Sequence, residues 1–195
     1  MNIRAHVTSY LTALIVAAAP PAIFAELNFF QSLDPAGALT EGDAAYDGGF
    51  GQHAGIELPD GSTSSFALGF AVPPEHPVGE PLLLGIWWHT GAASTPCTAV
   101  LRPNFISVAT LNSGHIVGPG ADTGLSPQDG APTLDATAPN VTRVKLYTID
   151  SPDGVTPLRP FDAINFGLFR PSADFRDDCD GGLVIQGIAV GSGTP

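Results

Sequence analysis

The hydrophobic residues of this 195-residue chain fall in short runs that Gly, Pro, Asp and Ser interrupt. The clearest run, residues 65–72, places Phe66, Leu68, Phe70 and Val72 at alternate positions, with smaller residues between them. Side chains of a β-strand point alternately to its two faces, so this run predicts a strand with one buried face. Two prolines follow the run and end the strand, because proline donates no backbone hydrogen bond to a sheet.

Similar runs predict further strands at residues 56–58, 82–89, 98–101, 105–111, 141–149, 163–170 and 183–190. Residues 82–89 (LLLGIWWH) are apolar at successive positions, which favours a central strand that is covered on both faces. Residues 141–149 alternate instead. For that strand we expect Val144, Leu146 and Thr148 to point inward, and Arg143, Lys145 and Tyr147 to point outward.

Two segments are less regular. Phe29 and Phe30 could anchor one strand, but the stretch that follows, residues 36–55, predicts a loop. Residues 112–139 are also rich in Gly, Pro, Asp and Ser. Uninterrupted loops of that length are uncommon in compact domains, so we expect either a functional surface loop or, as we favour, a short strand near residues 133–136.

The chain after its first 25 residues predicts an all-β fold. With 23 Gly and 19 Pro among 195 residues, a long helical bundle or coiled coil is excluded. About eight strands without long crossover helices favour an antiparallel two-sheet sandwich of jelly-roll type over a parallel sheet. We expect residues 26–195 to form a single β-sandwich domain, since no linker divides them.

Residues 1–25 have the features of a secretory signal peptide. Arg4 supplies the positive start, residues 11–19 form a short apolar stretch, and cleavage is expected after Ala25 or nearer Ala19. A membrane anchor is the alternative, but the apolar stretch is shorter than the roughly 20 residues that span a bilayer. We therefore expect a secreted or cell-surface protein without a membrane span.

Cys97 and Cys179 are the two cysteines of the chain. An even count in an exported protein favours a disulfide, and two unpaired thiols are the alternative, since the sequence alone does not fix the pairing. Zinc binding is disfavoured, because the chain has no Cys-x-x-Cys and no close pair of histidines.

The charge of the chain excludes one class of partner. Seven Lys and Arg stand against 19 Asp and Glu, which gives a formal net charge of −12. Nucleic acids and anionic lipid surfaces repel such a protein, and the cations are scattered along the sequence.

Residues 66–190 resemble a jelly-roll-like β-sandwich module that recurs in secreted bacterial and phage-associated proteins. The stretches that carry the likeness are FALGFAVPPEH (66–76), PLLLGIWWHTGA (81–92) and INFGLFRPSADFRDDCDGGLVIQGIAV (164–190). Pro171 after Arg170, and Gly182 where the module commonly has Asp, depart from its pattern. The resemblance implies a structural or adhesive module and transfers no catalytic residue.

An acidic segment near the C-terminus raises the question of a metal site. Asp174, Asp177, Asp178 and Asp180 lie within seven positions. Calcium is an oxygen-seeking ion that would relieve the repulsion between such carboxylates, although the spacing is not that of an EF-hand. A solvated acidic turn, neutralised in part by Arg170 and Arg176, is the interpretation we favour.

Three aromatic residues, Trp87, Trp88 and Tyr147, raise the hypothesis of carbohydrate binding. Adjacent tryptophans in a strand point to opposite faces, so one is expected in the core and the other exposed or covered by the long loop. Burial of both is the favoured alternative, because large aromatic side chains supply much of the buried area of a core.

Hydrolysis is the enzymatic alternative, since His53, His76, His89 and His115 follow the leader together with many Asp and Ser. The chain contains neither Gly-x-Ser-x-Gly nor His-Glu-x-x-His, but a Ser–His–Asp site can assemble from distant positions. The favoured function is an exported, non-enzymatic structural, assembly or adhesion module that presents an acidic surface. The expected partner of such a module is a second copy that pairs through the sheet edges, another surface protein or a polysaccharide. A carbohydrate-binding module and a secreted hydrolase are the alternatives.

Overall fold

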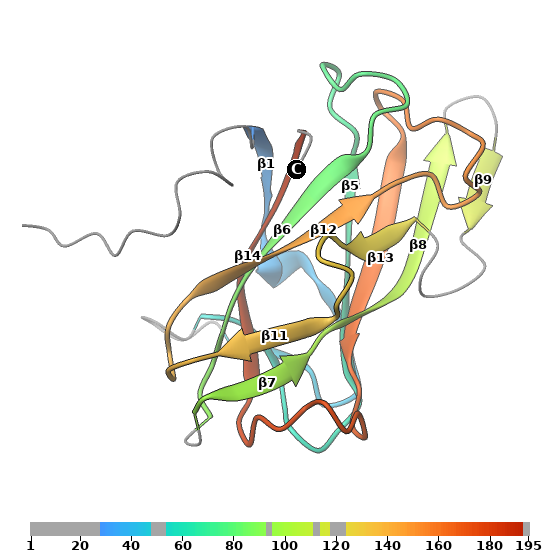
Figure 1. Ribbon diagram of the computed structural model, residues 1–195. Helices are drawn as coiled ribbons and strands as arrows, with labels where there is room; N and C mark the ends of the chain where they lie inside the picture. The colour runs from blue at the N-terminus through green and yellow to red at the C-terminus, as the bar shows by residue number, and fades with distance from the viewer. Residues whose placement is uncertain (1–27, 48–53, 93–94, 111–113, 118–123, 193–195) are drawn as a thin grey trace, which may run out of the picture.

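Two antiparallel β-sheets face each other in the computed structural model (Figure 1), which describes residues 28–47, 54–92, 95–110, 114–117 and 124–192. One sheet has seven strands in the order β10-β12-β6-β14-β4-β3, with β1 also paired to β14. The other has five strands in the order β2-β5-β13-β8-β9, and β7 and β11 form a separate pair. The predicted all-β antiparallel sandwich is therefore confirmed.

The strands of the seven-stranded sheet are β10 (Leu125–Pro127), β12 (Arg143–Ile149), β6 (Leu82–Thr90), β14 (Leu183–Ser192), β4 (Gly55–Leu58), β3 (Ala45–Asp47) and β1 (Asn28–Leu33). Those of the five-stranded sheet are β2 (Leu39–Glu41), β5 (Ser64–Ala71), β13 (Ala163–Arg170), β8 (Arg102–Thr110) and β9 (Gly114–Val117). The separate pair is β7 (Cys97–Val100) and β11 (Thr133–Ala136). One short 3₁₀ turn, Pro35–Gly37, lies between β1 and β2.

The core lies between the inner faces of the two sheets. Phe66 and Phe70 of β5 are buried there as their alternation predicts, and the rings of Phe70 and Phe166 meet edge to face with centroids 6.3 Å apart. The seven-stranded sheet adds Leu84 and Ile86 from β6. Burial of large apolar side chains on both inner faces is the main stabilising contribution in a sandwich of this kind.

Short strands supplement those that the sequence predicts. The short strand predicted near residues 133–136 is confirmed as β11, but β9 and β10 also lie in the segment 112–139. Residues 36–55, predicted as a loop, contain β2 and β3. All three side chains of β2, and all three of β3, are exposed, so these edge strands bury no apolar face that the sequence pattern could have revealed.

The prediction for residues 141–149 has the correct alternation and the wrong face. Tyr147 and Lys145 of β12 pair with Leu84 and Ile86 of β6, on the inner side of the sheet. Tyr147 is 0% exposed, and its hydroxyl donates a hydrogen bond to the backbone oxygen of Leu101 at 2.9 Å. Burial raises the pKa of Tyr147 well above its usual value, because the phenolate would lose its hydration. Tyr147 is therefore a core residue.

Cys97 and Cys179 are joined in a disulfide that links β7 to the turn before β14. Both residues are buried. The bond holds together positions 82 apart in sequence, so it fixes the separate β7–β11 pair to the C-terminal part of the sandwich.

Within the described part of the chain, no helix reaches the length and hydropathy that a membrane-spanning segment requires.

Candidate functional site

Trp87 and Trp88 point to opposite faces of β6, as neighbouring residues of a strand must. Trp88 is on the inner side and 3% exposed, whereas Trp87 is half-buried on the outer side. Trp88 lies near the end of β6 and is one of the residues that line a surface cleft between the seven-stranded sheet and β11.

This cleft, which we call the Trp88 cleft, is built from three strands and one turn. Its walls are formed by Trp88 of β6, by Arg143, Val144 and Lys145 of β12, by Thr133, Leu134 and Asp135 of β11, and by Asp129 from the turn between β10 and β11. Arg143 pairs directly with Trp88 across the sheet. Arg143 and Lys145 reach the cleft because they lie on the inner side of β12, whereas the sequence analysis expected them to point outward.

An ion pair spans the cleft. Lys145 Nζ lies 2.7 and 2.6 Å from the two carboxylate oxygens of Asp129 and also donates to the Thr133 backbone oxygen at 3.1 Å. Partial burial works against the charge of Asp129, but the hydrogen bonds from Lys145 and the Ala131 backbone outweigh it and lower its pKa. Asp129 is thus an anion at neutral pH, and the pair ties the 128–131 turn to β12.

Two hydrogen-bond donors of the cleft residues have no acceptor among the described residues. They are the indole Nε1 of Trp88 and the Nε of Arg143, and both atoms are buried. The Arg143 Nη2 group donates to the Thr137 hydroxyl, so only part of its guanidinium is satisfied. Buried donors are nearly always paired in folded proteins, and an unpaired one commonly marks a ligand or water site.

A second cleft lies on the other side of the same turn. Arg102 and Arg176 line it together with Gly130 and Pro132, whereas Asp129 and Thr133 line the Trp88 cleft. Four of the seven Lys and Arg residues of the chain therefore gather around residues 127–133. Because these cations are far apart in the sequence, the sequence pattern gave no signal of this grouping.

The acidic segment before β14 separates into individual contacts. Asp174 pairs with Arg102 and Arg176, Asp177 pairs with Arg170, and Asp178 accepts a hydrogen bond from the Thr98 backbone at 2.5 Å. Asp180 is exposed. Within the described residues, no group of three or more His, Cys, Asp or Glu side chains is arranged to hold a metal ion. Arg170 and Arg176 pair with these carboxylates, but the side chains of Asp174 and Asp177 are 2% and 6% exposed, so these two are not in the solvated turn that the sequence analysis favoured.

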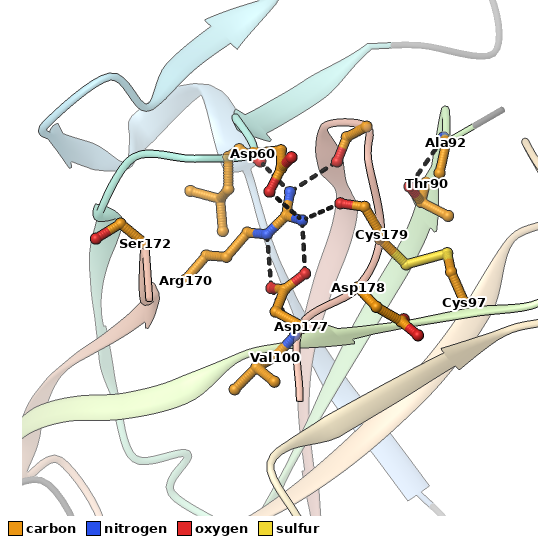
Figure 2. Close-up of polar contacts among 12 residues, drawn as sticks. Asp60, Thr90, Ala92, Cys97, Val100, Arg170, Ser172, Asp177, Asp178 and Cys179 are labelled. Atoms are coloured by element: carbon orange, nitrogen blue, oxygen red, sulfur yellow. Dashed lines mark hydrogen bonds and ion pairs between the residues drawn. A yellow bond between two sulfur atoms is a disulfide. The ribbon is translucent and has the colours of Figure 1, made fainter. Parts of the chain in front are cut away.

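Arg170 is the centre of these contacts (Figure 2). Its side chain is 1% exposed and forms two hydrogen bonds with the carboxylate of Asp177, at 2.9 and 2.8 Å. The remaining donors reach the backbone oxygens of Leu58, Gly181 and Cys179 at 3.1, 2.7 and 2.8 Å. Arg170 thus joins the end of β13 to β4 and to the disulfide-bonded turn, so its role is structural.

Asp174 makes the stability of the fold sensitive to acid. Hydrogen bonds from the Arg176 side chain, and a further contact with Arg102, hold the pKa of this nearly buried carboxyl well below its usual value. The stabilisation is present above the unfolded pKa of about 3.9 and is lost as the pH falls toward the folded value. We expect the melting temperature to stay level from about pH 7 to 5 and to drop below about pH 4.

Replacement by asparagine tests this expectation. Asp174→Asn should lower the melting temperature at neutral pH and make the acid decline shallower, because one carboxylate no longer titrates. Thermal unfolding followed by circular dichroism between pH 7 and 2 measures both effects. An acid decline of equal steepness in the two proteins would contradict the assignment to Asp174.

Two of the histidines proposed for a hydrolytic site have described side chains. His76 is buried, and its Nε2 lies 2.9 Å from the Glu80 backbone oxygen, which accounts for that nitrogen. His89 is buried on β6, on the face opposite Trp88. Neither residue lines the Trp88 cleft. His53 lies outside the described residues, as does the side chain of His115.

Comparison with known proteins finds distant structural similarity. No protein-family profile matches the sequence, and no curated protein matches it either. A xylan-binding module, CBM15, matches with 13% identity and a TM-score of 0.43, over 83% of this chain and 95% of that module. TmCBM61, in a complex with β-1,4-galactotriose, matches with 7% identity and a TM-score of 0.33, over 82% of this chain and 87% of its own.

Proposed function

We propose that this protein is a carbohydrate-binding module and that a polysaccharide segment binds in the Trp88 cleft. The observation that carries the proposal is the pairing of Trp88 with Arg143, each with a buried donor that lacks an acceptor, in a cleft that also contains Asp129, Asp135 and Lys145. Of the three aromatic residues that suggested sugar binding, this assigns a role to Trp88, which lines the cleft, and none to Trp87 or Tyr147, which do not line it.

The composition of the cleft suits a sugar better than an apolar ligand. Sugar hydroxyls both donate and accept hydrogen bonds, so they can satisfy the carboxylate of Asp135 and the Nε of Arg143 together. Charged partners make such hydrogen bonds stronger than neutral ones. Trp88 is 3% exposed, so its contribution is the indole Nε1 donor that a sugar hydroxyl can satisfy, not an open stacking surface.

The charge of the cleft favours a neutral polysaccharide. Asp129 and Asp135 balance Arg143 and Lys145, whereas the whole chain carries a formal charge of −12. A neutral glycan escapes the repulsion that the acidic surface exerts on an anionic polymer. We therefore expect uncharged oligosaccharides to bind, and acidic ones such as oligogalacturonate to bind weakly.

Titration of the disulfide-bonded protein with oligosaccharides tests the proposal. Xylan oligosaccharides and β-1,4-galactotriose are suitable first probes, followed by a wider panel of neutral and acidic glycans. Binding should change the tryptophan fluorescence and release heat in calorimetry. Absence of binding across the whole panel would contradict the proposed function.

A matched pair of variants locates the site. Arg143→Gln should weaken binding by about tenfold or more, because a hydrogen bond to a charged group contributes roughly 1.5–3 kcal/mol. Arg159→Gln, the same change at an exposed arginine outside the cleft, should leave the affinity unchanged. Equal affinities for both variants and the unmodified protein would move the binding site away from the Trp88 cleft.

The proposal retains export and the absence of catalysis as predictions. A structural disulfide suits an oxidising compartment outside the cytoplasm. Adhesion to a polysaccharide surface is also compatible with the structural and adhesive module that the sequence analysis favoured. N-terminal sequencing of the exported protein would test cleavage after Ala25.

A further inference from the structure

Three rows on the outer face of the five-stranded sheet consist mainly of small residues and carry no Asp, Glu, Lys or Arg. Cross-strand pairing places Leu39, Ala67, Gly167 and Phe105 in one row from β2 to β8. The next two rows are Gly69, Asn165 and Ser107, and then Ala71, Ala163 and Ala109. We call these three rows the small-residue face.

The rows of the small-residue face differ from the acidic remainder of the surface in charge. The protein has 19 Asp and Glu and a net charge of −12, yet between β2 and β8 none of the three rows contains a charged residue; beyond β8 the third row continues to His115 of β9. Leu39 is 76% exposed, and Ala71, Ala163 and Asn165 are exposed as well. An exposed sheet face normally carries polar and charged side chains, so this one is suited to contact with another surface.

The shape of the face also suits a protein surface. A Cβ atom at Gly167 would lie 2.5 Å from Cε1 of Phe105, so the phenyl ring lies against the sheet over this glycine. A shallow groove between Leu39 and Phe105 has Ala67, Gly69 and Asn165 among its lining residues. Asn165 is its source of side-chain hydrogen bonds, so the groove fits an apolar side chain better than a sugar.

We propose that the small-residue face binds a second copy of this chain. Two molecules of charge −12 repel each other where acidic surfaces meet, but this face lets them approach without bringing like charges together. A two-fold axis parallel to the strands exchanges the β2 and β8 sides of the face. It places Leu39 of each copy against Phe105 of the other, and both apolar side chains leave water.

The charges beside the face match the same two-fold axis. The row that follows Leu39–Phe105 consists of Glu41, Ser65, Phe169 and Arg102. Glu41 is exposed, and the Arg102 side chain is 42% exposed although it also contacts Asp174. In a dimer with this axis, Glu41 of each copy lies opposite Arg102 of the other copy, so the interface contains two such pairs. This charge complementarity favours a second copy over an unrelated partner.

Sedimentation equilibrium of the exported, disulfide-bonded chain tests the proposal without depending on glycan binding. We expect a reversible dimer. Ala71→Arg should weaken dimerisation by about tenfold or more, because a charge on the face loses its hydration without gaining a partner. Val155→Arg adds the same charge at a position that is 85% exposed and outside the face, so it should leave dimerisation unchanged or slightly stronger.

Two further variants keep the result decisive. Ala163→Arg repeats the test on β13 in case Ala71→Arg fails to fold, and unchanged melting temperatures show which variants are intact. Glu41→Lys should also weaken the dimer, because it opposes Arg102 with a like charge. A monomer at every concentration overturns the proposal, as does equal weakening by the face variants and Val155→Arg. A dimer that none of the face variants affects would use another surface and would also overturn it.

Discussion

Replacement of Asp177 by asparagine is expected to lower the free energy of unfolding by about 3–5 kcal/mol, because it leaves the guanidinium of Arg170 buried without its counter-ion. Arg170 is 1% exposed and Asp177 6% exposed, so water cannot replace the lost carboxylate. The same carboxylate also accepts a hydrogen bond from the Val100 backbone at 3.0 Å, which ties β7 to this cluster. Urea denaturation of the purified variant measures the loss.

Asp60→Asn provides the matched control. Asp60 contacts the same guanidinium at 3.4 Å, but its side chain is 50% exposed. Ion pairs with an exposed partner contribute about 0–1 kcal/mol, so this variant should unfold almost as the unmodified protein does. If both variants lost the same small amount, Arg170 would not depend on Asp177, and the structural role assigned to the cluster would be wrong.

Removal of the disulfide is expected to have a comparable effect. In the double variant Cys97→Ala and Cys179→Ala, the free energy of unfolding should fall by about 4 kcal/mol. Without the bond, the unfolded chain has more conformational entropy, which stabilises the unfolded state. The bond spans 82 positions of sequence and fixes the β7–β11 pair, which forms one wall of the Trp88 cleft. Glycan affinity should therefore fall together with stability.

Reduction separates the effect of the bond from that of the substitutions. A reducing agent should lower the melting temperature of the unmodified protein and leave that of the double variant unchanged. The two proteins should then unfold at similar temperatures under reducing conditions. A reduced protein as stable as the oxidised one would show that packing alone holds the β7–β11 pair in place.

The sequence predicted the strands whose apolar residues alternate clearly. Residues 65–72 became β5, and residues 163–170 became β13, because one face of each is large and apolar and can be buried in only one register. The strands β2 and β3 escaped prediction, since their side chains are exposed and their sequences resemble loops. A local pattern reveals a strand only where that strand buries a face.

The face of β12 shows a different limit of the sequence. Val144, Leu146 and Thr148 alternate with Lys145, Tyr147 and Ile149, and each set contains apolar residues. The alternation shows that this segment is a strand but does not show which set of side chains faces the core. Pairing with β6 places the second set, Lys145, Tyr147 and Ile149, on the inner face of the sheet. The same pairing brings Arg143 beside Trp88 and creates the cleft.

The sequence by itself determined the all-β fold class, because the spacing of apolar residues and the frequency of Gly and Pro act locally along the chain. It also supplied the two cysteines and the excess of negative charge. Only the tertiary structure decided that Lys145 meets Asp129, that Arg102 and Arg176 share Asp174, and that three rows of the small-residue face carry no charge between β2 and β8. These features join residues distant in sequence, and their positions follow from strand order and register, which no single segment encodes.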